Sequence, residues 1–214
     1  MITLNSDAAS TSLSKTTKAI LNEYGIKLNK NLGQNYLIDR NKRNQIIQFG
    51  NLTKDDVVLE IGPGIGTLTI ELAKRVKKVI AIEQDSNICQ ILENRLKKEN
   101  IDNVELINDD ALNVEFPKFD KIISNLPYQI SSPITFKFLN YDFQLAILMY
   151  QKEFASRMNG KVGSKDYSRL SAMLYFKCDV DLLTGVSAES FIPKPKVDST
   201  VVRLTPKLPE LNGH

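Results

Sequence analysis

The first stretch that could do chemistry is a glycine-rich turn. Val57 to Ile61 predict a strand, Gly62-Pro63-Gly64-Ile65-Gly66 predict a turn, and a helical pattern begins at Thr67. Glycines let the backbone approach a ligand closely, and a helix start offers free N–H groups. Glu83, 21 residues after Gly62, ends the next predicted strand and can accept hydrogen bonds from ribose hydroxyls. These features indicate a nucleoside cofactor. Gly-x-Gly-x-Gly alone does not name it, because it differs from the dinucleotide fingerprint by one residue.

Asn125-Leu126-Pro127-Tyr128, after the fourth predicted strand, has the groups needed to methylate an exocyclic amine of a base. Such an amine is a weak nucleophile, and acceptors for both of its N–H groups favour the pyramidal amine of the transition state. The Asn125 side-chain oxygen and the Leu126 carbonyl can supply these acceptors. Pro127 stiffens the turn, and Tyr128 offers an aromatic face to a flipped base. An ordinary tight turn is the alternative interpretation.

Two adjacent acids, Asp109 and Asp110, follow the third predicted strand. Ligands of open α/β sheets bind at the carboxyl ends of the strands, so these carboxylates are candidate ligand-binding groups. A turn or helix cap is the alternative, and the two residues alone favour it.

Composition narrows the possible chemistry. The only histidine is His214, which excludes histidine-dependent triads and histidine metal sites, and no metal is expected. Cys89 and Cys178 are isolated, which argues for a reducing compartment and predicts two small core residues. The chain has neither a secretory start nor an apolar run of roughly 18 residues. The protein is therefore predicted to be soluble and cytoplasmic, with no membrane partner.

Positive charge is concentrated near the N-terminus, although the net charge is only +3. Residues 15 to 54 contain eight basic side chains against two acidic ones. We expect Lys27, Lys30, Lys42 and Arg43 to face RNA phosphates. A solvated helical face is an equally acceptable interpretation of the charge alone.

The order of elements predicts an α/β fold. Helical patterns alternate with strands up to residue 176, and two closing strands then follow. This predicts a Rossmann-like, doubly wound, mostly parallel seven-stranded sheet with one antiparallel edge strand. Ser14 is expected to cap the first helix, and Ser131 or Ser132 the helix that contains Pro133. We expect a disordered extension over residues 1–14, one domain over 15–206 and a short tail over 207–214.

Seven blocks in this order resemble the ribosomal small-subunit RNA adenine dimethyltransferases, a family of S-adenosylmethionine-dependent enzymes with the class I methyltransferase fold. The resemblance covers about residues 29–206. The blocks are Asn31-Leu32-Gly33-Gln34-Asn35-Tyr36-Leu37, Glu60 to Gly66, Glu83, Asp110-Ala111-Leu112, Asn125 to Pro133, Tyr167 to Ser171, and Phe191 to Ser199.

The resemblance implies S-adenosylmethionine as cofactor and assigns roles to individual residues. Glu83 would hold the ribose, Asp110 the adenine amine, and Gly62 would let the backbone approach the methionine part. Asn125 would contact the amino-acid end of the cofactor, the target amine, or both. The full implied cofactor set is Asn35, Leu37, Gly62, Gly64, Glu83, Gln84, Asp110, Ala111 and Asn125.

The implied reaction adds two methyl groups to N6 of each of two adjacent adenosines near the 3′ end of small-subunit rRNA, in ribosome biogenesis. Asn125 to Tyr128 would form the catalytic loop, and Tyr128 and Phe191 would sandwich the target adenine. The implied partner is the pre-ribosomal small subunit, and we expect a monomer. Family members usually continue into a small helical domain, whereas only Pro206 to His214 follow the last strand here.

Three other functions fit parts of the pattern. A non-catalytic RNA-binding or ribosome-assembly factor could keep the same fold. A resistance-type methyltransferase acting on large-subunit RNA would have a similar catalytic loop. A nicotinamide dehydrogenase is the weakest alternative, because it leaves Asn125 to Tyr128 without a role.

Overall fold

The computed structural model describes residues 12–27 and 35–208. Its centre is a seven-stranded sheet in the order β4-β3-β2-β5-β6-β9-β7. The strands are β2 (Val57–Ile61), β3 (Lys78–Glu83), β4 (Val104–Asn108), β5 (Lys121–Asn125), β6 (Leu145–Gln151), β7 (Cys178–Val186) and β9 (Ser199–Pro206). The predicted doubly wound α/β fold is confirmed.

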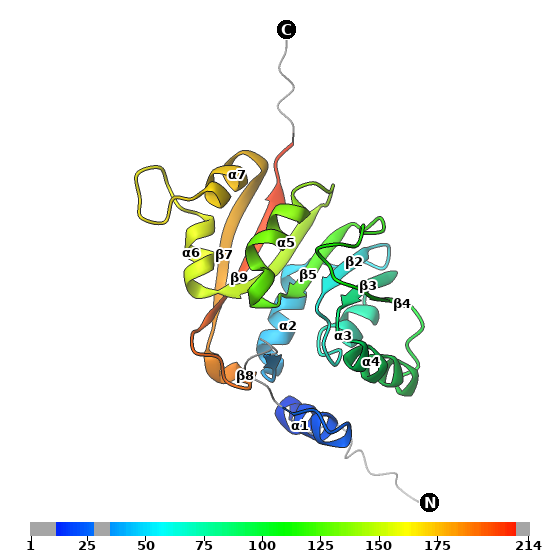
Figure 1. Ribbon diagram of the computed structural model, residues 1–214. Coiled ribbons are helices and arrows are strands. Elements are labelled where there is room, and N and C mark those ends of the chain that lie inside the picture. The colour runs from blue at the N-terminus through cyan, green and yellow to red at the C-terminus, as the bar shows by residue number, and fades with distance from the viewer. Residues whose placement is uncertain (1–11, 28–34, 209–214) are drawn as a thin grey trace, which may run out of the picture.

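Helices cover both faces of this sheet (Figure 1). One face packs against α2 (Arg40–Phe49) and α3 (Thr69–Ala73), with α4 (Ser86–Lys98) toward the β4 edge. The other packs against α5 (Ser131–Phe138), α6 (Lys152–Met158) and α7 (Arg169–Lys177). Successive strand residues point to opposite faces, so Val58 joins the first cluster and Leu59 the second. Both faces are apolar, as a covered parallel sheet requires.

The antiparallel strand lies one position inside the predicted edge. β9 pairs antiparallel with both β6 and β7, and β7 forms the edge. The prediction of an antiparallel edge strand is therefore wrong in position. A hairpin connection makes β9 antiparallel to β7, and its apolar residues Val201, Val202 and Leu204 are fully buried between its two neighbours.

A second, two-stranded sheet was not predicted. β1 (Tyr36–Leu37) pairs antiparallel with β8 (Phe191–Ile192), with Leu37 opposite Phe191. The pair brings residues after the N-terminal segment next to the Phe-Ile-Pro block near the other end of the chain. Two-residue strands carry no detectable alternation, so this contact depends on the tertiary fold.

Several helix starts differ from expectation. α1 (Leu13–Glu23) is capped by Ser12, whose side chain accepts from the Lys15 N–H, so Ser14 lies inside the helix. Residues 12–14 thus belong to the helix start, while residues 1–11 and 209–214 lie outside the described residues. Ser131 is the first residue of α5, and no side chain caps it. Asp39 caps α2, and its side chain accepts from the Lys42 N–H.

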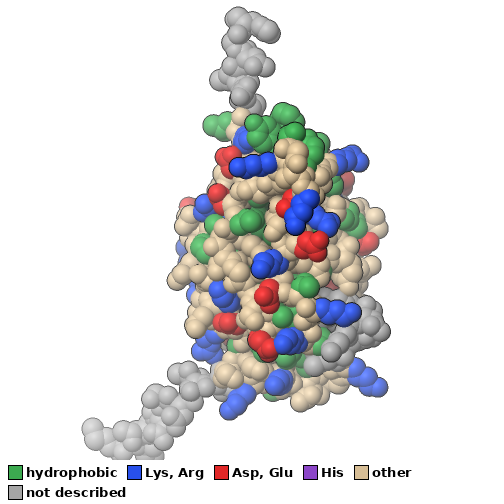
Figure 2. All heavy atoms as spheres, turned by 90° about the vertical axis from the view of Figure 1, so that its left-hand side faces the viewer, with side chains coloured by type: hydrophobic (Ala, Val, Ile, Leu, Met, Phe, Trp, Pro, Cys, Tyr) green, Lys and Arg blue, Asp and Glu red, His purple; other side chains and the backbone are tan. Residues whose placement is uncertain are grey.

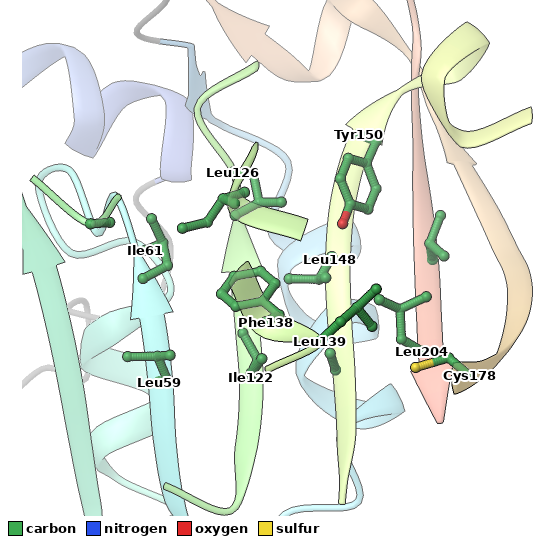
Figure 3. Packing of buried hydrophobic residues seen from close by; sticks show 14 of the residues in the cluster. Leu59, Ile61, Ile122, Leu126, Phe138, Leu139, Leu148, Tyr150, Cys178 and Leu204 are labelled. Carbon is green, nitrogen blue, oxygen red and sulfur yellow. The ribbon is translucent and has the colours of Figure 1, made fainter. Parts of the chain in front are cut away.

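The core beneath the carboxyl ends of the strands is continuous (Figure 3). Ile61 of β2, Phe138 of α5 and Leu126 after β5 meet there and are at most 2% exposed. Cys89 and Cys178 are buried and unpaired, as small core residues.

The face over α6, α7 and β7 mixes basic and acidic side chains, and hydrophobic ones gather near the end of the described chain (Figure 2). Tyr175, Phe176 and Leu208 are the most exposed aromatic and aliphatic residues of that end. No helix within residues 12–27 or 35–208 combines the length and the apolar character needed to cross a bilayer.

Candidate active site

A cavity of about 520 Å³ lies at the carboxyl ends of the parallel strands. Its lining residues fall within five segments, of which the first contains β1 and the other four lie at or just after the end of a strand. They are 35–37, 60–68, 82–88, 109–111 and 125–130. This is the position at which ligands of open α/β sheets bind.

The cavity brings together nearly all the residues predicted to hold a cofactor or a target base. Those lining it are Asn35, Leu37, Gly62, Gly64, Glu83, Gln84, Asp110, Ala111, Asn125, Leu126, Pro127 and Tyr128. They come from four strand ends and β1, because a parallel sheet places those ends along one edge. What each of them binds remains a prediction.

Two glycines of the turn have a positive φ, which disfavours any other residue, and Gly62 is also crowded by a neighbouring side chain. Gly62 has a φ of +70°, and a Cβ there would lie 3.0 Å from Cγ of Pro127. Gly64 has a φ of +56°, and its N–H donates to Oε2 of Glu83 at 3.3 Å. The turn therefore contacts the loop after β5 on one side and the end of β3 on the other.

Glu83 is held by the backbone at the floor of the cavity. Its Oε1 accepts from the Asp85 N–H at 3.0 Å, and its Oε2 accepts from Gly64. Burial raises the pKa of Glu83 and the Asp85 charge adds to the rise, while the backbone donors oppose it. A carboxylate fixed in this way keeps lone pairs for further donors.

Glu60 also lines the cavity, and sequence reasoning assigned it no role. Its side chain is almost fully buried and accepts a 2.6 Å hydrogen bond from the Thr69 hydroxyl. Burial raises the pKa of Glu60 to about 8, and the charge of Glu83 contributes to the rise. The available signal was an acid inside an apolar strand, immediately before the glycine turn.

Asp110 is both a turn cap and a cavity residue, the two interpretations that its sequence position allowed. Its carboxylate accepts from the Leu112 N–H at 2.9 Å and from Nδ2 of Asn113 at 3.3 Å, as a turn cap does. It also lines the cavity beside Asp109. The cap fixes the carboxylate and leaves acceptor capacity facing the cavity.

The Asn125-to-Tyr128 loop is tied to neighbouring elements at both ends. Nδ2 of Asn125 lies 3.5 Å from the Asn35 carbonyl, to which it donates. The Tyr128 hydroxyl makes a short hydrogen bond with Oγ of Ser199. Tyr128 begins the 3-10 helix η3 (Tyr128–Ile130), and burial raises the pKa of its phenol, so the ring is neutral at neutral pH.

Phe191 does not reach the cavity, so the predicted sandwich of Tyr128 and Phe191 is wrong in this conformation. The Phe191 side chain is 1% exposed and packs in the core cluster that contains Leu37 and Val201. Its pairing with Leu37 in the small sheet turns the ring inward. A sequence block identifies the residue but not the face to which its side chain points.

Of the predicted RNA-contacting cations, the three that the structure describes lie apart from the cavity lining. Lys27 is exposed after α1, and Lys30 lies outside the described residues. Lys42 is half-buried, and its Nζ donates to Oγ1 of Thr184 at 3.2 Å. Arg43 donates to Oδ1 of Asn44, and burial lowers the pKa of its guanidinium.

Tyr36 is a further cavity residue that the sequence did not single out, although its neighbours Asn35 and Leu37 were. Its ring lies 3.4 Å from the position of a Cβ on Gly64, so it packs on the glycine turn. Burial raises the pKa of Tyr36 to about 12, with the charges of Glu83 and Asp85 adding to the rise.

Residues 25–213 match the ribosomal RNA adenine dimethylase family. The chain belongs to this family. Members of the family transfer methyl groups from S-adenosylmethionine. This confirms the resemblance drawn from the seven sequence blocks, together with the cofactor that it implied.

Curated relatives in the family are named "Probable ribosomal RNA small subunit methyltransferase A". The protein of Methanosphaera stadtmanae is 55% identical over 191 residues, which cover 89% of this chain and 70% of the relative. The protein of Methanothermobacter thermautotrophicus is 53% identical, with 89% and 68% covered. The chain thus spans about two thirds of the length of these relatives.

Two solved structures are similar in both sequence and fold. A dimethyladenosine transferase from Plasmodium falciparum has a TM-score of 0.76 and 42% identity, covering 80% of this chain and 63% of that one. The 23S rRNA methyltransferase ErmE has a TM-score of 0.73 and 34% identity, with 81% and 70% covered. Both agree with the class I methyltransferase fold.

Proposed function

We propose that the chain transfers methyl groups from S-adenosylmethionine to N6 of two adjacent adenosines near the 3′ end of small-subunit rRNA, two to each. The closeness of Gly62 to Pro127 carries this proposal, because the glycine turn and the loop after β5 then form two walls of one cavity. The names of the relatives at 55% and 53% identity support the choice of RNA.

The residues present fit the cofactor. A cavity of about 520 Å³ lies within the usual range for small-molecule sites. When bound, S-adenosylmethionine supplies a methyl group on a positively charged sulfur. Glu83, fixed by two backbone N–H groups, would accept from the ribose hydroxyls, and Asp110 would accept from the adenine amine. Gly62 and Gly64 have no Cβ atoms, so their backbone would leave room for the amino-acid part of the cofactor.

The loop after β5 would activate the target amine. Oδ1 of Asn125 and the Leu126 carbonyl would accept the two N6 hydrogens, which favours a pyramidal nitrogen with its lone pair available. Nδ2 of Asn125 donates to the Asn35 carbonyl, and Oδ1 is the acceptor atom of the same side chain. Tyr128 would stack on one face of the adenine. Because the amine attacks through its lone pair, no cavity residue has to remove a proton before the methyl transfer.

RNA outside the cavity would be held by charge. Lys27, Lys30, Lys42 and Arg43 remain the proposed contacts, and affinity for RNA should fall steeply as salt rises. A flat salt profile would instead assign these side chains to a solvated surface. We also propose that the protein acts as a monomer in the cytoplasm.

The direct test incubates the purified chain and S-adenosylmethionine with small subunits whose 3′-terminal adenosines are unmethylated. Mass spectrometry of digested rRNA should detect N6,N6-dimethyladenosine at two adjacent positions. Asn125→Ala serves as the inactive control, and its thermal melt reports whether the fold stays intact.

Two outcomes would redirect the assignment. Dimethyladenosine confined to large-subunit RNA would favour the activity named for ErmE. Binding of small subunits without cofactor binding or methylation would favour an assembly factor. Either result contradicts the proposed reaction and leaves the fold unaffected.

A further inference from the structure

The hydrogen bond between Tyr128 and Ser199 joins two parts of the chain that are 71 residues apart. Tyr128 lies on the cavity wall in a one-turn 3-10 helix. Ser199 is the first residue of β9, is 1% exposed, and pairs with Gln151 of β6 and Val186 of β7. The bond therefore connects a loop of the active site to an interior strand.

Ser199 is rigidly placed by the residue that precedes it. The Asp198 carbonyl accepts from the Lys152 N–H at 3.0 Å, at the start of α6. Its Oδ1 accepts from the Ala188 N–H at 2.8 Å, in the 3-10 helix η4 (Ala188–Ser190). These bonds and the pairing on both sides fix the backbone of Ser199, and so the position of its Cβ, within hydrogen-bonding reach of the Tyr128 hydroxyl.

Tyr128 needs such a support. It follows Pro127 in η3, which has no side-chain cap, and its carbonyl accepts from Oγ of Ser131 at 3.0 Å. These backbone contacts place its Cα, but the direction of the ring is set by the side-chain torsions. A bond to the hydroxyl at the far end of the ring restrains χ1, the torsion that sets the direction of the ring axis.

We propose that Ser199 is a positioning residue for the methyl-transfer reaction, holding the Tyr128 ring in the orientation that stacks on the target adenine. The inference rests on the proposed function. It also explains the Val-Asp-Ser sequence, since Asp198 anchors the start of the strand and Ser199 orients the ring. Small misplacements of a substrate-holding group reduce rate strongly even when binding survives.

The test is a double-mutant cycle of Ser199→Ala and Tyr128→Phe, read by single-turnover methylation of small subunits at saturating S-adenosylmethionine. We expect each variant to be slower by about tenfold, as for one lost hydrogen bond, and the double variant to be no slower than either. Cofactor affinity should stay within about twofold. Ser199→Thr, which keeps the hydroxyl, should recover most of the rate.

Ser171→Ala is the matched control. Ser171 is a buried hydroxyl in the capping box of α7, away from the cavity. Its removal should lower the melting temperature about as much as Ser199→Ala without slowing the reaction. If Ser199→Ala and Ser171→Ala slowed the reaction equally, or if the two effects in the cycle multiplied, Ser199 would be only a structural residue.

A measurement without turnover separates this inference from the proposed function. NMR of tyrosine-labelled protein should show a wider range of χ1 for the Tyr128 ring in Ser199→Ala than in the wild type. An unchanged ring would overturn the positioning role. Absence of dimethyladenosine with the wild-type chain would instead contradict the proposed function and leave the ring measurement interpretable.

Discussion

A buried acid lies at each end of β2, and the surroundings of the two acids shift their pKa values in opposite directions. Asp56, just before the strand, accepts from Nζ of Lys121 at 2.9 Å and from the Thr53 N–H at 2.7 Å. Glu60, near the carboxyl end, accepts from the Thr69 hydroxyl and lines the cavity. Burial favours the neutral form of both acids, but only Asp56 has a cation beside it.

The pKa values record this difference. For Asp56, burial acts to raise the pKa, but the hydrogen bonds and charge of Lys121 outweigh it, so the pKa lies below its usual value. For Glu60, burial prevails and raises the pKa to about 8. One end of the strand is built to hold the sheet together. The other keeps polar groups available to a ligand, at a cost in stability.

The largest expected effect lies at the carboxyl end. Asn125→Ala should reduce methyl transfer by about 10³-fold, because it removes one of two acceptors for the target amine in the transition state. The melting temperature should stay within about 2 °C, since Asn125 is only partly buried and its one side-chain bond is long. Single-turnover rates and thermal melts check both parts. Full activity in this variant would remove Asn125 from the mechanism.

At the amino end, Lys121→Met should lower the free energy of unfolding by about 3 kcal/mol, because it leaves the buried Asp56 carboxylate without its cation. The folded fraction should bind S-adenosylmethionine normally. Denaturant unfolding measures the first quantity and calorimetric titration the second.

Lys98→Met is the control for this variant, because Lys98 pairs with Glu23 on the surface. It should leave stability unchanged. If Lys121→Met weakened cofactor binding in proportion to its loss of stability, the two ends of β2 would not have separate roles in stability and binding.

Glu60→Gln should change how stability depends on pH. The pKa of Glu60 is about 8 in the folded protein and 4.5 ordinarily, so between these values the folded state keeps a proton that the unfolded chain releases. Stability from this group is therefore complete below the lower value and is lost as pH rises through the higher one. The variant should gain about 10 °C in melting temperature relative to wild type between about pH 5 and pH 8. A constant difference across that range would mean that Glu60 is ionised in both states.

The smallest expected effect is on cofactor affinity. Glu83→Gln should weaken S-adenosylmethionine binding by about tenfold, because an amide replaces one of two charged acceptors for the ribose hydroxyls. Asp85 makes a helix cap beside it, so Asp85→Asn serves as the neighbouring control and should change affinity less. Equal losses in the two variants would point to general electrostatics rather than to a ribose contact.

Local sequence patterns predicted which residues gather at the carboxyl end of the sheet. They did not predict features that depend on pairing between distant parts of the chain. Gly62, Glu83, Asp110 and Asn125 each follow a strand with a clear apolar pattern, and parallel topology brings such ends together. The inward turn of Phe191 depends on pairing with Leu37, 154 residues away in sequence, which no local pattern encodes. The same holds for the position of β9 inside the sheet edge.

The cavity at the carboxyl end of the sheet is where we expect S-adenosylmethionine to bind, and the proposed chemistry depends on this placement. Hydrogen exchange of the chain with and without S-adenosylmethionine tests it most directly. We predict added protection in segments 35–37, 60–68, 82–88, 109–111 and 125–130, with no change around Asp56 and Lys121 at the opposite end. Protection at the opposite end, or none at the glycine turn, would contradict this placement.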